Sequence, residues 1–333
     1  MTKTNKKLLL IMPMFFDYPQ IIKRKLYDMG YDVDVFDDRP STSGWVKAAV
    51  RIDRNLLKNY IKHYFDTMMS TIGKNHYHVV LLISGQSLSL GKDMIETIRA
   101  SQPQALFVLY QWDSLHNFPY IAQMHCYFDK LYTFDRHDAA QNDQLKFLPL
   151  FYCERYEQIK KLTSCNFQYD FCFVGTAHPK KYKLVNRMSA QLKPVYPNQF
   201  IYFFYPSRLV FFYRKLRNRE LRKSHYGEFH FTPLSGKEME DIFKASRCVL
   251  DSAQSGQTGL TIRVLEALGA GKKLITTNED VKNYDFYRPE NIYIYDGDID
   301  MSSPFFTESY REIDTVIYEK YSLRSWLEEL LSP

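Results

Sequence analysis

Apolar and polar residues alternate along the first half of the chain in a pattern that predicts repeated strand–helix units. Continuous apolar runs at Lys7–Met12, Val79–Ile83 and Ala105–Tyr110 indicate strands whose two faces are both covered. Further strands are predicted at 33–36, 131–134 and 146–150, and helices at 18–29, 45–72 and 91–100. Strands and helices that alternate at this spacing are typical of a parallel α/β sheet.

The same pattern begins again after a polar connector at about Glu154–Gln168. Gly175-Thr176 is interpreted as a turn, and Pro179 is a favourable residue for the first turn of the next helix. Strands are predicted at 169–174, 201–205, 228–232, 248–251, 273–277 and 291–295, and helices at 179–193, 237–245, 259–270 and 310–331. We therefore predict two α/β domains, 1–155 and 168–305, with C-terminal helices in 306–333 available to pack back on the first.

Composition argues against several other classes of protein. An apolar share of 45% in 333 residues is enough for two packed cores, and a net charge of +6 is too small to indicate a nucleic-acid-binding protein. The five cysteines include no CxxC pair, which indicates reduced thiols in place of a disulfide framework or a zinc site. Because no apolar run approaches the roughly 18 residues of a membrane span, we expect a cytoplasmic protein.

The stretch Asp251–Gly271 is the part of the sequence with the most chemical information. It predicts a strand end, a loop of small residues and a helix that stops at a glycine. In open α/β sheets, ligands bind beyond the carboxyl ends of the strands, and the amides at a helix N-terminus suit a diphosphate. Gly259 would allow a close approach of the backbone, and Thr258 and Thr261 offer hydroxyl groups.

Arg263 and Glu266 are three residues apart, so they share one face of the predicted helix. Arg263 could reach phosphate oxygens, while the Glu266 carboxylate could accept hydrogen bonds from both ribose hydroxyls. The alternative is an intrahelical ion pair on the surface, worth about 0.2–0.5 kcal/mol. The adjoining glycine and hydroxyl residues favour a ligand site, to which we also assign Gln257 and Leu260.

Several motifs together resemble the GT-B glycosyltransferases. The run Gly259-Leu260-Thr261, Arg263 and Glu266-Ala267-Leu268, followed by Gly271–Asn278, resembles their nucleotide-binding segment, most closely in bacterial capsule and lipopolysaccharide biosynthesis proteins related to spore-maturation glycosyltransferase-like proteins. Phe173–Thr176, with Arg187 on the next helix, resembles the opening of their C-terminal domain. Asp113-Ser114, Tyr132–Asp135 and Leu148–Leu150 resemble landmarks of their N-terminal domain.

This resemblance implies a GT-B fold, with two Rossmann-like parallel-sheet domains facing across a cleft. It implies transfer of a sugar from a nucleotide donor, a UDP-sugar first and GDP- or CMP-sugars as alternatives, without a required metal. The acceptor would be a glycan or lipid-linked glycan of a surface polysaccharide: capsule, O-antigen or lipopolysaccharide. Glu266 would hold the ribose, and Gly175, Thr176 and Arg187 would join the donor site. Many retaining members carry another Glu where this chain has Thr258, so the stereochemistry stays open.

Three side chains of the first domain are candidates for the catalytic machinery. Asp113 follows the strand at 105–110, and His116 is three residues further on, close enough to pair with it. Asp17 lies in the loop after the first strand. Both carboxylates also have a purely structural interpretation, because Asp113 could cap a helix and Asp17 could stabilise its own loop.

Two charged segments have competing interpretations. Asp296-Gly297-Asp298 has the spacing of a metal-binding DxD motif but follows the last predicted strand as an acidic turn, so we predict no metal site there. The segment 200–223 combines aromatic residues with seven cations, which would suit the inner leaflet of a membrane or, equally, a strand and a helix with a solvated basic face. A nucleotide-sugar epimerase and a non-catalytic glycan- or membrane-binding scaffold remain the alternative functions.

Overall fold

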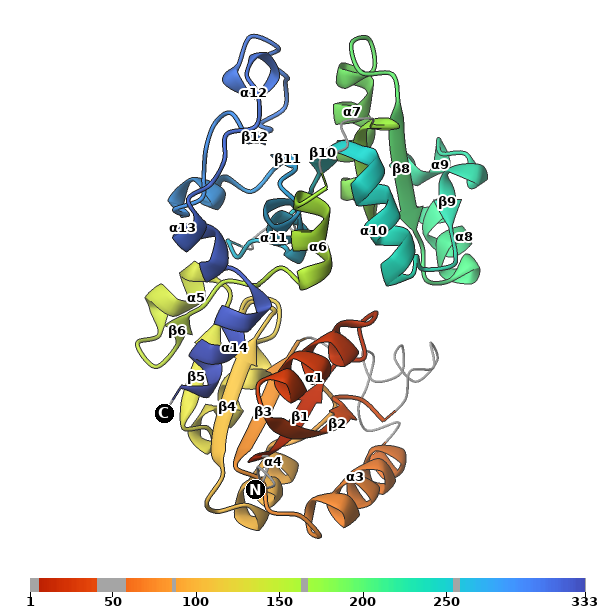
Figure 1. Cartoon of the computed structure of the whole chain (residues 1–333). Coiled ribbons are helices and arrows are strands. Elements are labelled where there is room, and N and C mark those ends of the chain that lie inside the picture. The colour runs from red at the N-terminus through yellow and green to blue at the C-terminus, as the bar shows by residue number, and fades with distance from the viewer. Residues whose placement is uncertain (1–5, 41–57, 86–87, 163–166, 254–257, 333) are drawn as a thin grey trace. The chain divides into compact units, whose positions relative to one another are not determined.

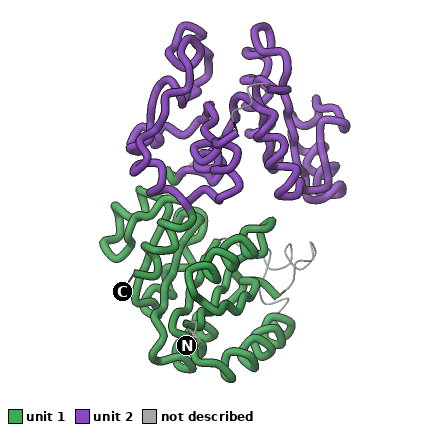
Figure 2. Tube along the Cα trace, viewed as in Figure 1, with its two compact units in different colours: residues 1–150, 256–259, 323–333 green, residues 151–255, 260–322 purple. Residues whose placement is uncertain are grey.

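The protein is described by a computed structural model that covers residues 6–40, 58–85, 88–162, 167–253 and 258–332. The chain divides into two compact units, coloured green and purple in Figure 2. Unit 1 comprises residues 1–150, 256–259 and 323–333, and unit 2 comprises 151–255 and 260–322. Each unit is built around its own parallel sheet of six strands (Figure 1).

The sheet of unit 1 has the strand order β2-β1-β3-β4-β5-β6. Its strands are β1 (Lys6–Met12), β2 (Tyr31–Asp37), β3 (Val79–Ser84), β4 (Leu106–Gln111), β5 (Lys130–Thr133) and β6 (Lys146–Phe147). The helices are α1 (Tyr18–Asp28), α3 (Lys58–Ile72), α4 (Lys92–Ser101), α5 (Arg136–Gln141) and α14 (Leu323–Leu331), and Pro119–Tyr127 forms a 3-10 helix. The part of the predicted 45–72 helix before Lys58 lies outside the described residues.

The core of unit 1 is built from the apolar runs of its central strands. Every residue of β3 is buried, as expected for a strand with helices on both faces. The C-terminal helix α14 also packs in this unit: the Trp326 ring lies 4.7 Å from that of Tyr110, and the Tyr132 hydroxyl donates to Glu329. Buried aromatic contacts of this kind hold the last residues of the chain to the sheet of the first unit.

The sheet of unit 2 has the order β12-β11-β10-β7-β8-β9. Its strands are β7 (Tyr169–Thr176), β8 (Gln199–Phe204), β9 (Phe229–His230), β10 (Ser246–Leu250), β11 (Lys273–Thr276) and β12 (Ile292–Ile294). Its α-helices are α6 (Glu154–Lys160), α7 (Pro179–Leu192), α8 (Arg208–Arg217), α9 (Arg219–Arg222), α10 (Gly236–Ala245), α11 (Ile262–Gly269), α12 (Pro304–Thr307) and α13 (Thr315–Lys320); 3-10 helices lie at Tyr226–Glu228 and Glu279–Asn283. Counted from β7, this is the order 3-2-1-4-5-6 of dinucleotide-binding sheets.

Local predictions were wrong at three places in unit 2. The connector 154–168 contains helix α6. Gly175 and Thr176 belong to strand β7, where they pair with Phe203 and Phe204, and do not form a turn. Helix α11 begins at Ile262, three residues later than predicted, because the amides of Thr258 and Gly259 donate to a carboxylate and their segment is not helical.

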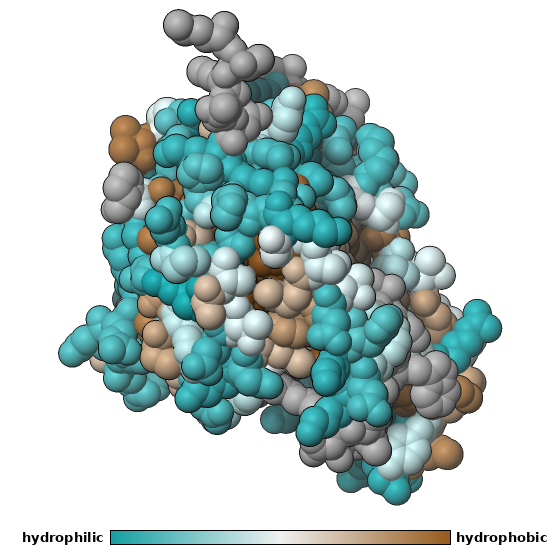
Figure 3. Space-filling view, turned by 90° about the horizontal axis from the view of Figure 1, so that it is seen from below, coloured by the Kyte–Doolittle hydropathy of each residue, from teal (hydrophilic) through white to brown (hydrophobic). Residues whose placement is uncertain are grey.

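The surface of the protein carries no membrane-spanning element in its described part. None of the helices there is both long and apolar enough to cross a bilayer. The face drawn in Figure 3 is mostly hydrophilic, with smaller groups of hydrophobic residues among the polar ones. A mixture of this kind is ordinary for a folded protein, because polar surface alone cannot cover a core.

Candidate functional site

The strand order of unit 2 places its ligand-binding position between β7 and β10. These neighbouring strands lead into crossover connections that run in opposite directions along the sheet, which makes this the topological switch point. Open α/β sheets bind ligands at the carboxyl ends of such strands. The chain leaves β7 at Thr176 and enters α7 at Pro179, and it leaves β10 at Leu250 and enters α11 at Ile262.

Asp251 organises this position. It follows β10 directly, is buried, and accepts hydrogen bonds from the hydroxyls of Thr261 at 2.8 Å and Thr276 at 2.9 Å. Thr261 is the N-cap residue of α11, and Thr276 ends the neighbouring strand β11. The carboxylate therefore ties the start of α11 to two strand ends and sets the direction in which the helix leaves the sheet.

Arg263 and Glu266 form the pair expected from their spacing, but the pair is not a surface contact. Arg263 Nη1 lies 2.5 Å from Glu266 Oε2, and the Glu266 side chain is only 5% exposed. The Arg263 guanidinium also lies over the ring of Phe243, and burial together with the Glu266 charge raises the pKa of Tyr156 well above its usual value. A buried charged pair is more costly to form than a surface pair, which favours a role beyond helix stability.

Lys181 is a third charged residue of this position, and sequence reasoning missed it. Burial lowers the pKa of Lys181, the charge of Asp251 opposes that shift, and the charge of Arg263 adds to it. Lys181 therefore lies close enough to both for their charges to act on it. Lys180-Lys181 directly after Pro179, in the first turn of a helix that follows a strand, was the available signal. We refer to Lys181, Asp251, Arg263 and Glu266 as the switch-point cluster.

The loop residues Thr258 and Gly259 are held by a carboxylate that the sequence analysis did not assign to the site. Within unit 1, Asp135 Oδ2 accepts from the amides of Thr258 and Gly259, each at 3.0 Å, and Oδ1 accepts from the Thr258 hydroxyl at 2.5 Å. Asp135 also caps α5 through the amides of His137 and Asp138. The amides that we expected to receive a diphosphate thus already bind an anion, namely this side chain.

The other predicted donor residues occupy different environments. A Cβ on Gly175 would lie 2.8 Å from the ring of Phe173, so a larger residue there would displace that ring. Arg187 forms an ion pair with Asp298 at 3.2 Å, and Asp298 belongs to the acidic turn 296–298. The Leu260 side chain is buried, and Gln257 lies outside the described residues. In the described part of the chain, no group of three or more His, Cys, Asp or Glu side chains could hold a metal ion.

Unit 1 has its own switch point, between β1 and β3, and aromatic residues gather beside it. Phe15 and Phe16 are 47% and 52% exposed, and their ring centroids are 4.4 Å apart. Phe15 also lies 6.3 Å from Trp112, which follows β4. Phe16 has a φ of +51°, a left-handed conformation that bulky residues rarely adopt. A backbone held in such a conformation is often part of a binding surface.

The three candidate catalytic residues lie in loops after the strands of this sheet. Asp113 Oδ1 accepts a hydrogen bond from Asn117 Nδ2 at 3.4 Å, and His116 is exposed. Asp17 is partly exposed, and its backbone carbonyl accepts the first hydrogen bonds of α1. All three side chains are therefore at least partly exposed to solvent, in the loops that carry Phe15 and Trp112.

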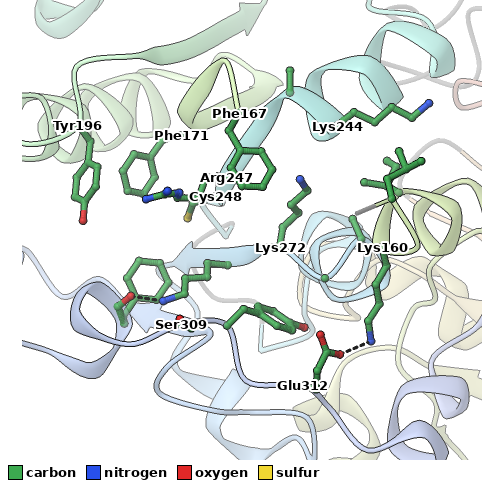
Figure 4. A pocket seen from close by; sticks show the side chains of 18 of the residues that line it. Lys160, Phe167, Phe171, Tyr196, Lys244, Arg247, Cys248, Lys272, Ser309 and Glu312 are labelled. Carbon is green, nitrogen blue, oxygen red and sulfur yellow. Dashed lines mark hydrogen bonds and ion pairs between the residues drawn. The ribbon is translucent and has the colours of Figure 1, made fainter. Parts of the chain in front are cut away.

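A cavity of about 800 Å³ lies at the opposite, amino-terminal edge of the unit 2 sheet (Figure 4). Its lining includes five cations: Lys160, Lys244, Arg247, Lys272 and Lys273. Lys160 pairs with Glu312, Lys244 with Glu240, and Lys272 and Lys273 donate to backbone carbonyls. The carboxyl-terminal ends of α10 and α11 point here, and their dipoles disfavour an anion. This cavity is therefore a poorer phosphate site than the switch-point cluster.

Comparisons with known proteins give the fold a wider context. No family model matches the sequence, and no curated protein matches it either. HepE of Anabaena, solved with UDP and glucose, is similar with a TM-score of 0.56 and 11% sequence identity over 97% of this chain and 99% of that one. An α-glucosyltransferase solved with UDP and a 13-mer DNA has a TM-score of 0.55 and 12% identity over 98% and 90% of the two chains. A glycosyltransferase from Rickettsia africae has a TM-score of 0.53 and 10% identity, with 99% of each chain covered.

These similarities, together with the two six-stranded parallel sheets, define a protein of the GT-B fold, as the sequence predicted. At this level of identity the likeness establishes the fold, and a functional assignment must come from the residues of the site.

Proposed function

We propose that the protein is a glycosyltransferase that takes its sugar from a nucleotide donor bound at the switch-point cluster. The observation that carries the proposal is the buried Arg263–Glu266 pair at the start of α11, a helix whose N-cap residue is tied to the β7–β10 switch point by Asp251. Lys181, in the first turn of α7 after β7, adds a second cation. Two cations and a helix N-terminus are suited to a diphosphate leaving group. The structural neighbours solved with UDP support a UDP-sugar as the donor.

In the proposed complex, Arg263 exchanges its contact with Glu266 for a phosphate oxygen. Glu266 then accepts hydrogen bonds from the ribose hydroxyls, as the resemblance of the 259–268 motif implies. Lys181 and Arg263 would stabilise the negative charge that develops on the leaving diphosphate, which is an electrostatic contribution to catalysis. This arrangement needs no metal ion for the leaving group, and GDP- and CMP-sugars remain the alternative donors.

The acceptor side of the proposal rests on unit 1. Phe15, Phe16 and Trp112 offer apolar ring faces of the kind that pack against sugar rings, and Asp17 and Asp113 lie beside them in the chain. We propose a glycan or lipid-linked glycan hydroxyl of a surface polysaccharide as the acceptor, in line with the capsule and lipopolysaccharide branch that the sequence resembles. Asp113 and Asp17 are our candidates for the general base, and His116 is a candidate partner of Asp113.

A thermal-shift screen of UDP, GDP, CMP and their sugars tests the donor assignment. Ligand at 100 times its dissociation constant adds about 2.7 kcal/mol to the free energy of unfolding, so the correct nucleotide raises the melting temperature by several degrees. We expect the shift to be lost in Glu266→Ala and kept in Lys183→Ala, whose exposed Lys pairs with Glu220 in the wild type. No shift with any nucleotide, or equal shifts in Glu266→Ala and the wild type, would contradict the proposal.

A further inference from the structure

Helix α8 buries a single side chain, Phe211, in unit 2. Phe211 is fully buried, and its ring lies 4.6 Å from that of Phe229 and 5.3 Å from that of Tyr205. It is the only buried residue of this ten-residue helix, and Ser207 caps its N-terminus. One face of α8 therefore anchors it to the domain. Beyond that face, the Phe212 ring stacks on that of Tyr226 at 5.6 Å, and Lys215 donates to the carbonyl of Ser224. Most of the remaining surface is exposed.

The outward face of α8 carries large apolar side chains in a helical stripe. Leu209, Phe212, Tyr213 and Leu216 follow the spacing i, i+3, i+4 and i+7, which places them on one side of the helix. They are 74%, 51%, 53% and 75% exposed, respectively. A surface helix of a globular protein normally turns such a stripe towards the core, so this helix has the reverse arrangement.

Cations border this stripe. The segment 208–223 contains a single carboxylate, Glu220, which pairs with Lys183 of α7, and seven cations: Arg208, Arg214, Lys215, Arg217, Arg219, Arg222 and Lys223. Among the described residues, none of these seven forms an ion pair with a carboxylate. By helical spacing, Arg208 and Arg217 lie on the two sides of the apolar stripe. Long basic side chains in such positions can keep their charge in water while their stems cover apolar surface.

We propose that α8 is a membrane-docking helix whose apolar stripe inserts into the interface of an anionic lipid bilayer while the bordering cations contact lipid phosphates. An amphipathic helix with aromatic and leucine side chains on one face and basic residues beside it is the physical signature of interfacial binding. The docking itself rests on α8 alone. Only its purpose rests on the proposed function, since a lipid-linked acceptor would lie at the membrane surface.

The charge distribution selects the bilayer over other occupants. A second copy of the chain would bring the same uncompensated cations against each other, which opposes association through this face. The structure also limits which part of segment 200–223, suggested by the sequence as a membrane contact, can bind a bilayer. Strand β8 lies inside the sheet between β7 and β9, so Gln199–Phe204 is committed to the fold and only the α8–α9 region can dock.

Vesicle co-sedimentation of the full-length protein tests the apolar stripe. We expect binding to vesicles of phosphatidylcholine with phosphatidylglycerol and little binding to phosphatidylcholine alone. The double variant Leu209→Ser/Leu216→Ser should lose on the order of tenfold or more in partitioning. Val316→Ser, which removes an equally exposed apolar side chain (78%) from α13, is the matched control and should bind like the wild type. Absence of wild-type binding, or equal losses in the two variants, would overturn the proposal.

The bordering cations are tested by the double variant Arg208→Gln/Arg217→Gln. The double variant Lys23→Gln/Arg24→Gln on α1 of unit 1 is the control. The α8 variant should bind anionic vesicles on the order of tenfold more weakly at low salt, and added salt should reduce the difference. The control pair should bind as the wild type does.

The docking proposal and the transferase proposal fail separately, because UDP binding is measured without vesicles. A wild-type protein that binds vesicles but not UDP would refute the transferase proposal alone. A wild-type protein that binds UDP but not vesicles would refute the docking proposal alone. If the leucine variant instead converts a dimer into a monomer in sedimentation velocity, the occupant is a second copy.

Discussion

The carboxyl edges of the two parallel sheets carry different chemistry on closely related scaffolds. Unit 1 has the order 2-1-3-4-5-6 and presents exposed aromatic rings at its switch point, notably Phe15 and Phe16. Unit 2 has the order 3-2-1-4-5-6 and presents Lys181 and Arg263 there, next to buried carboxylates. The strand order fixes where a ligand can bind in each sheet, while a few loop residues decide whether the surface suits a sugar face or a phosphate.

The largest expected effect comes from removing the cations that distinguish unit 2. Lys181→Met and Arg263→Met should each lower kcat/KM for sugar transfer by on the order of 10²–10³-fold, because each removes a charge that stabilises the leaving diphosphate. Lys183→Met is the matched control from the same helix as Lys181, because its exposed ammonium pairs with Glu220, and it should change kcat/KM by less than about threefold. If Lys183→Met is as damaging as Lys181→Met, the donor phosphates lie elsewhere along α7.

The amino edges of the sheets also differ, and this difference predicts a pH dependence of stability. In unit 1, burial alone would lower the pKa of Lys7, but Asp34 and Asp32 raise it above its usual value. In unit 2, burial lowers the pKa of Lys272 to about 8, and its ammonium donates to the carbonyl of Ser246. Between about pH 8 and 10.5, the unfolded chain therefore binds more protons at Lys272 than the native state does. The cost of burying the charged lysine is fully present below about pH 8, and the free energy of unfolding rises as the pH rises through this range.

Lys272→Met should accordingly raise the free energy of unfolding at pH 7 by about 1–3 kcal/mol, and flatten its rise between pH 8 and 10.5. Urea denaturation at several pH values measures both effects. A variant that is less stable than the wild type at pH 7, with an unchanged slope, would show that the contact of Lys272 with Ser246 outweighs the cost of burying its charge.

Asp135 of unit 1, which binds the loop residues Thr258 and Gly259 of the same unit, provides a smaller effect. Asp135→Ala removes an acceptor of two loop amides, one loop hydroxyl and the amides at the start of α5, and should lower the free energy of unfolding by about 2 kcal/mol. The exposed Asp143→Ala is the control and should change it by less than about 0.5 kcal/mol. Equal melting temperatures for Asp135→Ala and the wild type would contradict this account.

The smallest effect concerns the left-handed backbone at Phe16. Phe16→Gly relieves a conformation that costs a bulky residue about 1 kcal/mol, so the variant should melt at or slightly above the wild-type temperature. Tyr60→Gly removes an equally exposed aromatic residue (46%) from α3 and should destabilise by about 1 kcal/mol. Loss of transfer activity in Phe16→Gly without loss of stability would support an acceptor role, whereas a clear fall in melting temperature would show that Phe16 serves the fold.

Much of the fold could be predicted because buried parallel strands have continuous apolar runs, as in Val79–Ser84. The switch-point cluster was only partly predictable. Arg263 and Glu266 are linked by helical spacing, whereas the Arg263 charge acts on Lys181 of a helix more than 80 residues earlier in the chain. Asp135 accepts from Thr258 across an even longer separation. Such contacts depend on which strands are neighbours, and the local pattern of residues does not contain that information.

Hydrogen exchange of the wild-type protein with and without UDP tests the central claim, that the β7–β10 switch point holds the nucleotide. UDP should give its strongest protection in peptides that cover the N-terminal turns of α7 and α11, around Lys181 and Arg263. Protection confined to the amino-edge cavity, in peptides around Arg247 and Phe305, would contradict the claim.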